Sequence, residues 1–315
     1  MFWGNKRVLL TGGYGFLGDV VYNKLINKCD EVIRFHSNEY DLTKEIEVKK
    51  LFNEKKDIDV VIHLAADVGG IEYNRKYPGS ILYNNLMMNT LLQHYSYVNN
   101  VKKFVGVGSV CAYPKFTEIP FKEENLWDGY PEETNASYGI SKKVMLEQSK
   151  SYNKQYNFNS IHLLMINLYG PNDDFDLENS HVIPALIRKF TEAKINNKEK
   201  VIAWGDGSPT REFMYVEDAA RGILLAAEKY DKPEPVNLGS GMEISIKELT
   251  NLIRDLVGFS GEIVWDKSKP NGQPRRCLDV SKAKEEFNFE ANINFESGLK
   301  KTIKWYKNSI RGIKI

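Results

Sequence analysis

A glycine-rich segment near the N-terminus, residues 11–18 (Thr-Gly-Gly-Tyr-Gly-Phe-Leu-Gly), constrains the fold of this chain more than any other feature. It lies between a short apolar run at 8–10 and an amphipathic stretch at 19–27. Gly12, Gly15 and Gly18 allow a tight strand-to-helix turn and close approach of the backbone to a pyrophosphate, whose charge suits a helix N-terminus. The segment therefore predicts a βαβ unit that binds a dinucleotide; the alternative is a turn that is merely glycine-rich.

The rest of the chain alternates short apolar runs with longer amphipathic stretches. The runs at 8–10, 32–33, 60–62, 104–107 and 163–166 are apolar throughout, which is typical of strands buried on both faces. Helical patterns separate them, at 19–27, 46–53, 81–98 and 141–156. Repeated strand–helix units predict an α/β fold, a doubly wound parallel Rossmann sheet with right-handed crossovers and helices on both sides.

The character of the sequence changes after Gly170-Pro171, where a polar, acidic stretch begins. We expect 1–170 to form the dinucleotide-binding domain and 171–315 to form mostly a smaller α/β substrate domain, with segments around 210–240 returning to the first. Within the second region, patterns predict helices at 182–193, 215–229, 245–256 and 295–306, and strands at 201–204 and 235–238.

Charge and cysteine content argue against several classes of function. Lys and Arg total 43 against 42 Asp and Glu, so the net charge of +1 offers no field for nucleic acid or an anionic membrane. No segment approaches the ~20 apolar residues that span a bilayer, and the start lacks a secretory pattern. Cys29, Cys111 and Cys277 show neither zinc nor disulfide spacing, which indicates a reducing compartment. We expect a cytoplasmic protein without a metal site.

Two residues four positions apart, Tyr138 and Lys142, share a face at the start of a predicted helix. A free phenol has a pKa of ~10, and a nearby ammonium group is expected to lower it. Ser109 ends a predicted strand, at the sheet edge where ligands bind in doubly wound folds. Its hydroxyl would bind a substrate carbonyl while Tyr138 donates a proton. Alone, such a pair is common helix packing; with the glycine turn it predicts a redox site.

Cys111 and His181 suggest a second proton-transfer reaction. In an extended segment, residues 109 and 111 point the same way, so a Cys111 thiolate would remove a proton from carbon beside the ketone that Ser109 binds. His181, after the acidic stretch, would deliver a proton to the opposite face, as an epimerisation needs. The alternatives are a structural cysteine and a helix-capping histidine.

The end of the second predicted strand bears on the choice of dinucleotide. It reads Val32-Ile33-Arg34-Phe35-His36 and has no carboxylate for a ribose 2′-hydroxyl. Arg34, with His36, would instead hold a 2′-phosphate; otherwise Arg34 is an ordinary surface residue. Asp41 and Leu42 lie further on, where Asp41 would contact the adenine.

Several longer motifs give the chain a resemblance over nearly its whole length. It resembles the extended short-chain dehydrogenase/reductase superfamily and, within it, the GDP-L-fucose synthase family. The motifs that carry this resemblance are Ala65-Ala66-Asp67-Val68-Gly69-Gly70-Ile71, Gly108-Ser109-Val110-Cys111-Ala112-Tyr113-Pro114-Lys115, Asn167-Leu168-Tyr169-Gly170-Pro171, Asn179-Ser180-His181-Val182-Ile183-Pro184-Ala185-Leu186, Trp204-Gly205-Asp206-Gly207, Arg211-Glu212-Phe213 and Lys269-Pro270-Asn271-Gly272-Gln273-Pro274-Arg275.

The resemblance implies a dual activity on a GDP-sugar: epimerisation of C3 and C5 of GDP-4-keto-6-deoxy-mannose by Cys111 and His181, then reduction of C4 with NADPH by Ser109, Tyr138 and Lys142. NAD is the alternative cofactor. Implied cofactor-binding residues are Gly12, Gly15, Phe16, Leu17, Gly18, Arg34, His36, Asp41, Leu42, Leu64, Ala65, Ala66, Val107, Tyr138, Lys142, Asn167 and His181. Implied substrate-binding residues are Asn167, Val182, Arg188, Lys189, Trp204 and Arg211. The resemblance also implies a homodimer formed by the helices at 81–98 and 141–156.

The chain departs from this family at several positions. Tyr14 and His36 stand where basic residues are common near the 2′-phosphate, Asp67 replaces a common lysine, and Asp19 places a carboxylate beside Gly18. Lys189 stands where a second arginine is common, and lysine keeps the charge but loses the bidentate fork. Two alternatives therefore remain: a related enzyme that acts at C4 of a GDP-heptose or GDP-dideoxyhexose, and a non-catalytic dinucleotide sensor.

Overall fold

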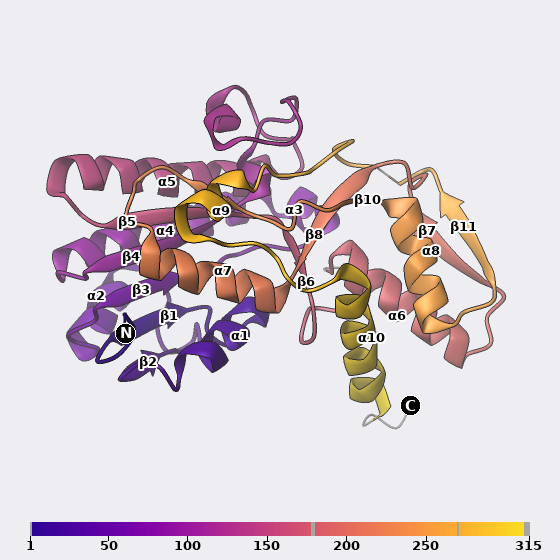
Figure 1. Cartoon of the computed structure of the whole chain (residues 1–315), viewed down its shortest axis with the longest axis horizontal. Helices are drawn as coiled ribbons and strands as arrows, with labels where there is room; N and C mark the ends of the chain where they lie inside the picture. The colour runs from indigo at the N-terminus through magenta and orange to yellow at the C-terminus, as the bar shows by residue number, and fades with distance from the viewer. Residues whose placement is uncertain (1, 178–179, 270, 312–315) are drawn as a thin grey trace.

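Six parallel strands form the central sheet, in the order β2-β1-β3-β4-β5-β9 (Figure 1). The computed structural model describes residues 2–177, 180–269 and 271–311. The strands are β1 (Arg7–Thr11), β2 (Glu31–Ile33), β3 (Val60–His63), β4 (Lys103–Ser109), β5 (Ser160–Met165) and β9 (Val236–Leu238). The chain runs from β1 to β2 on one side and returns to β3 on the other. The carboxyl ends of β1 and β3 therefore flank a topological switch point, where such folds bind ligands.

Helices cover both faces of this sheet. Alternate strand residues face opposite sides: Val8 and Leu10 pack with α1 (Phe16–Leu25) and α7 (Val216–Lys229), whereas Leu9 packs with α2 (Glu45–Glu54) and α4 (Pro78–Val98). A long helix, α5 (Ala136–Tyr156), lies beside α4. The predicted doubly wound parallel sheet is confirmed.

The smaller part of the molecule, on the right in Figure 1, is built on two short sheets. One has the order β10-β8-β6, from β6 (Asn167–Tyr169), β8 (Thr210–Tyr215) and β10 (Glu243–Ser245); the other pairs β7 (Lys200–Trp204) with β11 (Glu262–Asp266). Three helices, α6 (Val182–Ile195), α8 (Ile246–Val257) and α10 (Phe295–Arg311), surround a core of their own with β7 and β8. Although it comes after Gly170, α7 packs against α1, and β9 joins the large sheet.

Several elements differ from the sequence prediction. Helix α5 begins at Ala136, earlier than its apolar pattern, because Gly139 N already donates to Asn135 O across a first turn of small and polar residues. Short helices α3 (Ile71–Lys76) and α9 (Ser281–Phe287), and strands β6, β8, β10 and β11, were not predicted. Two 3₁₀ turns span Val110–Ala112 and Glu123–Trp127. Within the described residues, the helices include none with the length and apolar character of a bilayer span.

Candidate active site

The glycine turn has the close contacts that its sequence predicts. Gly12 has a φ of +67°, and a Cβ there would lie 2.9 Å from Ala65 N. Gly15 N donates to Gly12 O at 3.0 Å and Gly15 caps α1, whose first residues are Phe16 and Leu17. A Cβ on Gly18 would overlap Gly12 O. A side chain at Gly12 or Gly18 would not fit, so glycine at these positions allows the tight turn that close approach of a pyrophosphate requires.

The segment after β3 completes the edge of the sheet beside the glycine turn. Leu64 N donates to Thr11 O and Ala65 N to Thr11 Oγ1, both at 3.3 Å. Ala66 precedes Asp67, whose carboxylate accepts from Tyr73 OH and from Asn84 Nδ2, both at 2.8 Å. Asp67 therefore ties this segment to α3 and α4.

The residues after β2 are less open to a ligand than the sequence suggested. Arg34 forms an ion pair with Asp19 of α1, at 3.2 Å, and His36 stacks on Tyr14. Other groups already occupy the Asp41 carboxylate: Thr43 N, Thr43 Oγ1 and Lys44 Nζ. The Thr43 hydrogen bonds hold the pKa of Asp41 below its usual value. Leu42 is buried in the core.

Tyr138 and Lys142 lie on α5, with Lys142 Nζ 5.5 Å from the Tyr138 ring centroid. The expected lowering of the phenol pKa is wrong for this structure: burial raises the pKa of Tyr138, and the charge of Cys111 adds to this. Burial likewise lowers the pKa of Lys142 to about 8. Among the described residues, this buried ammonium has no hydrogen-bond acceptor. A dinucleotide ribose would supply one, so Lys142 and the glycine turn fit the cofactor; Val107 of β4 is buried in the adjacent core.

Cys111 is not in an extended segment, so that part of the prediction is wrong. Ser109 ends β4, and Val110–Ala112 form a 3₁₀ turn in which Cys111 N donates to Ser109 Oγ at 3.2 Å. A Cβ on Gly139 would overlap Cys111 O. Gly139 therefore lets the turn pack against α5 beside Tyr138. Cys111 and Ser109 are therefore neighbours because the chain turns between them, and not because alternate residues of a strand point the same way.

Arg276 is a site residue that sequence reasoning missed. Its Nη1 donates to Cys111 Sγ at 3.6 Å, and its Nε donates to Gln273 Oε1 at 2.8 Å. Arg276 as a whole residue is buried, at 7% exposure. The only sequence signal is its position directly after a motif of the resemblance.

His181 caps α6 with extended backbone and keeps contact with solvent. Surrounding protein atoms lower the pKa of its imidazole; the charge of Asp174 opposes this effect and that of Arg276 adds to it. Val182 begins α6 and is half-buried. Asn167 of β6 donates from Nδ2 to Glu212 O at 3.1 Å. Asn179 lies outside the described residues.

Trp204, at the end of β7, has an exposed ring with two ammonium groups near it. Lys189 Nζ is 5.4 Å and Lys269 Nζ 4.7 Å from the ring centroid. Sequence reasoning did not single out Lys269. Arg188 is directed elsewhere: it donates to Phe175 O at 3.0 Å and pairs with Glu192 at 2.8 Å. The structure thus brings Lys189, but not Arg188, to Trp204.

Arg211 and Glu212 of β8 bind the segments around residues 240 and 271–278. Arg211 donates to Thr210 O and Asn271 O, and burial together with the Arg276 charge lowers its pKa to about 10. Glu212, fully buried, accepts from three backbone amides: Ser240 N, Gly241 N and Leu278 N. Glu212 therefore anchors the segment that carries Arg276, a role that local sequence does not reveal.

The chain is similar to known proteins in both sequence and fold. Residues 8–239 match the model of the NAD dependent epimerase/dehydratase family. GDP-L-fucose synthase 1 of Arabidopsis thaliana is 38% identical, over 97% of this chain and 94% of that protein. A GDP-6-OMe-4-keto-L-xylo-heptose reductase from C. jejuni superposes with a TM-score of 0.90 at 31% identity, covering 97% of this chain and 98% of that one. A GDP-L-fucose synthetase from Naegleria fowleri bound to NADP gives 0.88 at 29% identity, covering 98% and 96%.

Proposed function

The chain belongs to the NAD dependent epimerase/dehydratase family, and from this premise we propose that it converts GDP-4-keto-6-deoxy-mannose to GDP-L-fucose with NADPH. The observation that carries the proposal is the 3₁₀ turn at Val110–Ala112, which puts a thiol beside the phenol of Tyr138 and the guanidinium of Arg276. Reduction alone has no use for that thiol, whereas epimerisation beside the same ketone needs a second acid/base group.

Reduction follows from the state of Tyr138. Because burial raises its pKa, the phenol is protonated at neutral pH and is able to give its proton to the oxygen at C4 as a general acid. Ser109 Oγ would hold the same oxygen, and Lys142 would hold the ribose next to the reacting ring. Bound NADPH supplies the hydride.

Epimerisation would use Cys111 as the base that removes the proton from C3 or C5. Arg276 Nη1 donates to the Cys111 sulfur, and the thiolate is the form of cysteine that would act as the base. His181 would return a proton to the opposite face. Since its pKa is lowered, its protonated form is a stronger acid than free imidazolium. Ser109 and Tyr138 would hold the enolate oxygen in both steps.

The nucleotide-sugar would bind between the two parts of the molecule. The exposed ring of Trp204 suits stacking on a planar base, and the flanking Lys189 and Lys269 suit a diphosphate. Arg211, which is half-buried, adds a further cation. Arg188, predicted for the same role, is held by Phe175 O and Glu192, so we propose it as a support for α6.

A second candidate function is C4 reduction of a GDP-heptose, favoured by the similarity to the C. jejuni reductase. It uses Ser109, Tyr138 and Lys142 but requires no proton exchange at C3 and C5.

One assay tests the proposal and separates the two candidates. GDP-4-keto-6-deoxy-mannose is incubated with NADPH in deuterated water, and the product is read by mass spectrometry and NMR. We expect GDP-L-fucose with deuterium at C3 and C5. Cys111→Ser should lose most of the exchange while still reducing a substrate that is already epimerised; Tyr138→Phe should lose reduction but keep dinucleotide binding. Reduced product without deuterium would contradict epimerisation and support the C4 reductase.

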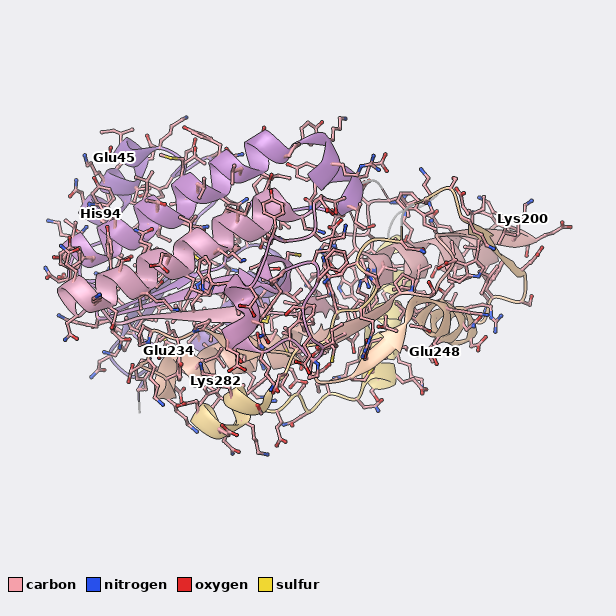
Figure 2. All side chains as sticks on the ribbon, turned by 90° about the horizontal axis from the view of Figure 1, so that it is seen from above. Glu45, His94, Lys200, Glu234, Glu248 and Lys282 are labelled. Atoms are coloured by element: carbon pink, nitrogen blue, oxygen red, sulfur yellow. The ribbon has the colours of Figure 1, made fainter. Side chains whose placement is uncertain are left out.

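We also propose that the protein is a cytoplasmic homodimer. All three cysteines are unpaired, which suits a reducing compartment. Helices α4 and α5 lie side by side in Figure 2, and Tyr83, Val98, Val144 and Tyr156 are exposed on them. Pairing of these helices with those of a second copy would cover the apolar side chains.

A further inference from the structure

The Arg34 guanidinium lies between two aromatic rings. Its Cζ is 4.2 Å from the ring centroid of Tyr14 and 3.5 Å from that of Tyr22. Tyr14 stacks in turn on His36, with centroids 3.9 Å apart and ring planes at 8°. Aromatic faces attract a guanidinium and fix its plane. Contacts with two rings therefore hold the guanidinium in place, and a ligand would bind it through its N–H groups.

The carboxylate of Asp19, in the first turn of α1, already bonds to Arg34. Arg34 Nη1 donates to Asp19 Oδ1 at 3.2 Å and to Gly13 O at 3.3 Å. The second oxygen of Asp19 accepts from Asn23 Nδ2, also at 3.2 Å. A Cβ on Gly13 would lie 2.7 Å from Arg34 Cβ, so glycine at this position lets the arginine lie across the turn. Asp19 is thus held by two donors, the Arg34 cation and the Asn23 amide.

Arg34 follows β2, the position that meets the adenosine ribose in this type of fold. A 2′-phosphate there, with a charge of about −2, would gain from Arg34 but would be repelled by Asp19. A free 2′-hydroxyl would instead donate to the Asp19 carboxylate. The end of β2 has no acidic residue. Asp19 of α1 would therefore supply the carboxylate that accepts from the ribose 2′-hydroxyl.

We propose that Asp19 sets the balance between the two dinucleotides: it weakens binding of the 2′-phosphorylated form and gives the unphosphorylated form an acceptor. This rests on the proposed function, because it assumes that the glycine turn binds a dinucleotide. The chain then binds NADH with an affinity close to that for NADPH.

The test measures dissociation constants for NADPH and NADH by fluorescence titration, without substrate. Asp19→Asn keeps the size of the side chain and an acceptor for Arg34 but removes the negative charge. We expect NADPH to bind about tenfold more tightly, equivalent to about 1.4 kcal/mol, and NADH to bind no more tightly than before. Arg34→Ala should weaken NADPH binding more than NADH binding.

Glu31→Gln is the matched control, because Glu31 also pairs with an arginine, Arg7, at 2.8 Å and lies at the opposite end of β2. It should leave both constants unchanged. An unchanged NADPH-to-NADH ratio in Asp19→Asn, or weaker NADPH binding, would overturn the role of Asp19. Failure of the wild-type protein to bind either dinucleotide would instead overturn the proposed function.

Discussion

The chemistry of Cys111 depends on Arg276, a residue 165 positions further along the chain. Among the residues that the structure describes, neither Cys29 nor Cys277 accepts a hydrogen bond from an arginine. Burial raises the pKa of Cys29 to about 11 and that of Cys277 to about 12, so both are thiols at neutral pH. The structure therefore singles out Cys111 as the cysteine with a cation at its sulfur.

This difference predicts selective alkylation. At pH 7, iodoacetamide should modify Cys111 well before Cys29 and Cys277, as read by peptide mass spectrometry. Arg276→Met should slow modification of Cys111 by about tenfold, because the reacting sulfur loses the positively charged donor beside it, and Arg276→Lys should restore most of the rate.

Arg275→Met serves as the control, because the neighbouring Arg275 is directed to Glu243, at 2.7 Å, instead of to the thiol. Equal rates in the Arg276→Met and wild-type proteins would contradict the role given to Arg276.

Within the central sheet, the imidazole of His162 lies between β4 and β5 without hydrogen bonds to any residue that the structure describes. His162 of β5 is fully buried, and neither ring nitrogen has a partner among the described residues. A Cβ on Gly108 of β4 would overlap His162, so glycine makes room for the ring. On β3, by contrast, His63 bonds to Thr11 at 2.8 Å and to Asn89 at 2.9 Å. The same residue type is thus satisfied in one strand and not in the other.

The two histidines predict how stability changes with pH. Burial lowers the pKa of both to about 3, against 6.5 for the free residue. The unfolded chain therefore binds protons below pH 6.5 that the folded protein does not, and the free energy of unfolding falls as the pH drops toward 3. His162→Leu should reduce this fall by about 1.4 kcal/mol per pH unit, measured by urea denaturation at pH 5.5 and pH 4.5.

At pH 7, the two leucine substitutions should differ in their effect on stability. His162→Leu removes nitrogens that have no partner, so it should be neutral or stabilising. His63→Leu leaves Thr11 and Asn89 unpartnered and should cost about 1–3 kcal/mol. A large loss of stability at pH 7 in His162→Leu would show that the imidazole is satisfied in solution.

At the scale of the whole molecule, the proposed dimer depends on one face of α4 and α5. Tyr83 is 59% and Val144 40% exposed there. Val144→Glu should convert the dimer to a monomer in light scattering, because a buried unpaired carboxylate is costly. Ile195→Glu, at a more exposed apolar position at the end of α6, should not change the mass. A monomeric wild-type protein would contradict the proposed dimer.

The division into 1–170 and 171–315 stays a proposal, and the contacts suggest how to refine it. Beyond α7 and β9, the chain crosses back again at Leu278, Phe287 and Phe289, which belong to the core around the central sheet. The smaller part would then comprise only the segments around α6, α8 and α10 with their two short sheets.

Local pattern alone was sufficient for the main strands, most helices and the glycine turn, because apolar periodicity and glycine spacing act between near neighbours in the chain. It did not predict β8 and β10, which are placed by pairing between distant segments, such as Glu243 with Glu212. The sequence motifs predicted Cys111, Tyr138 and His181 as candidate catalytic residues. The groups that surround these side chains depend on tertiary packing. The contact of Arg276 with Cys111, the carboxylate that Asp19 brings to Arg34, and the burial that raises the pKa of Tyr138 all join residues from different elements. Charge and burial act through space, so only the folded chain decides them.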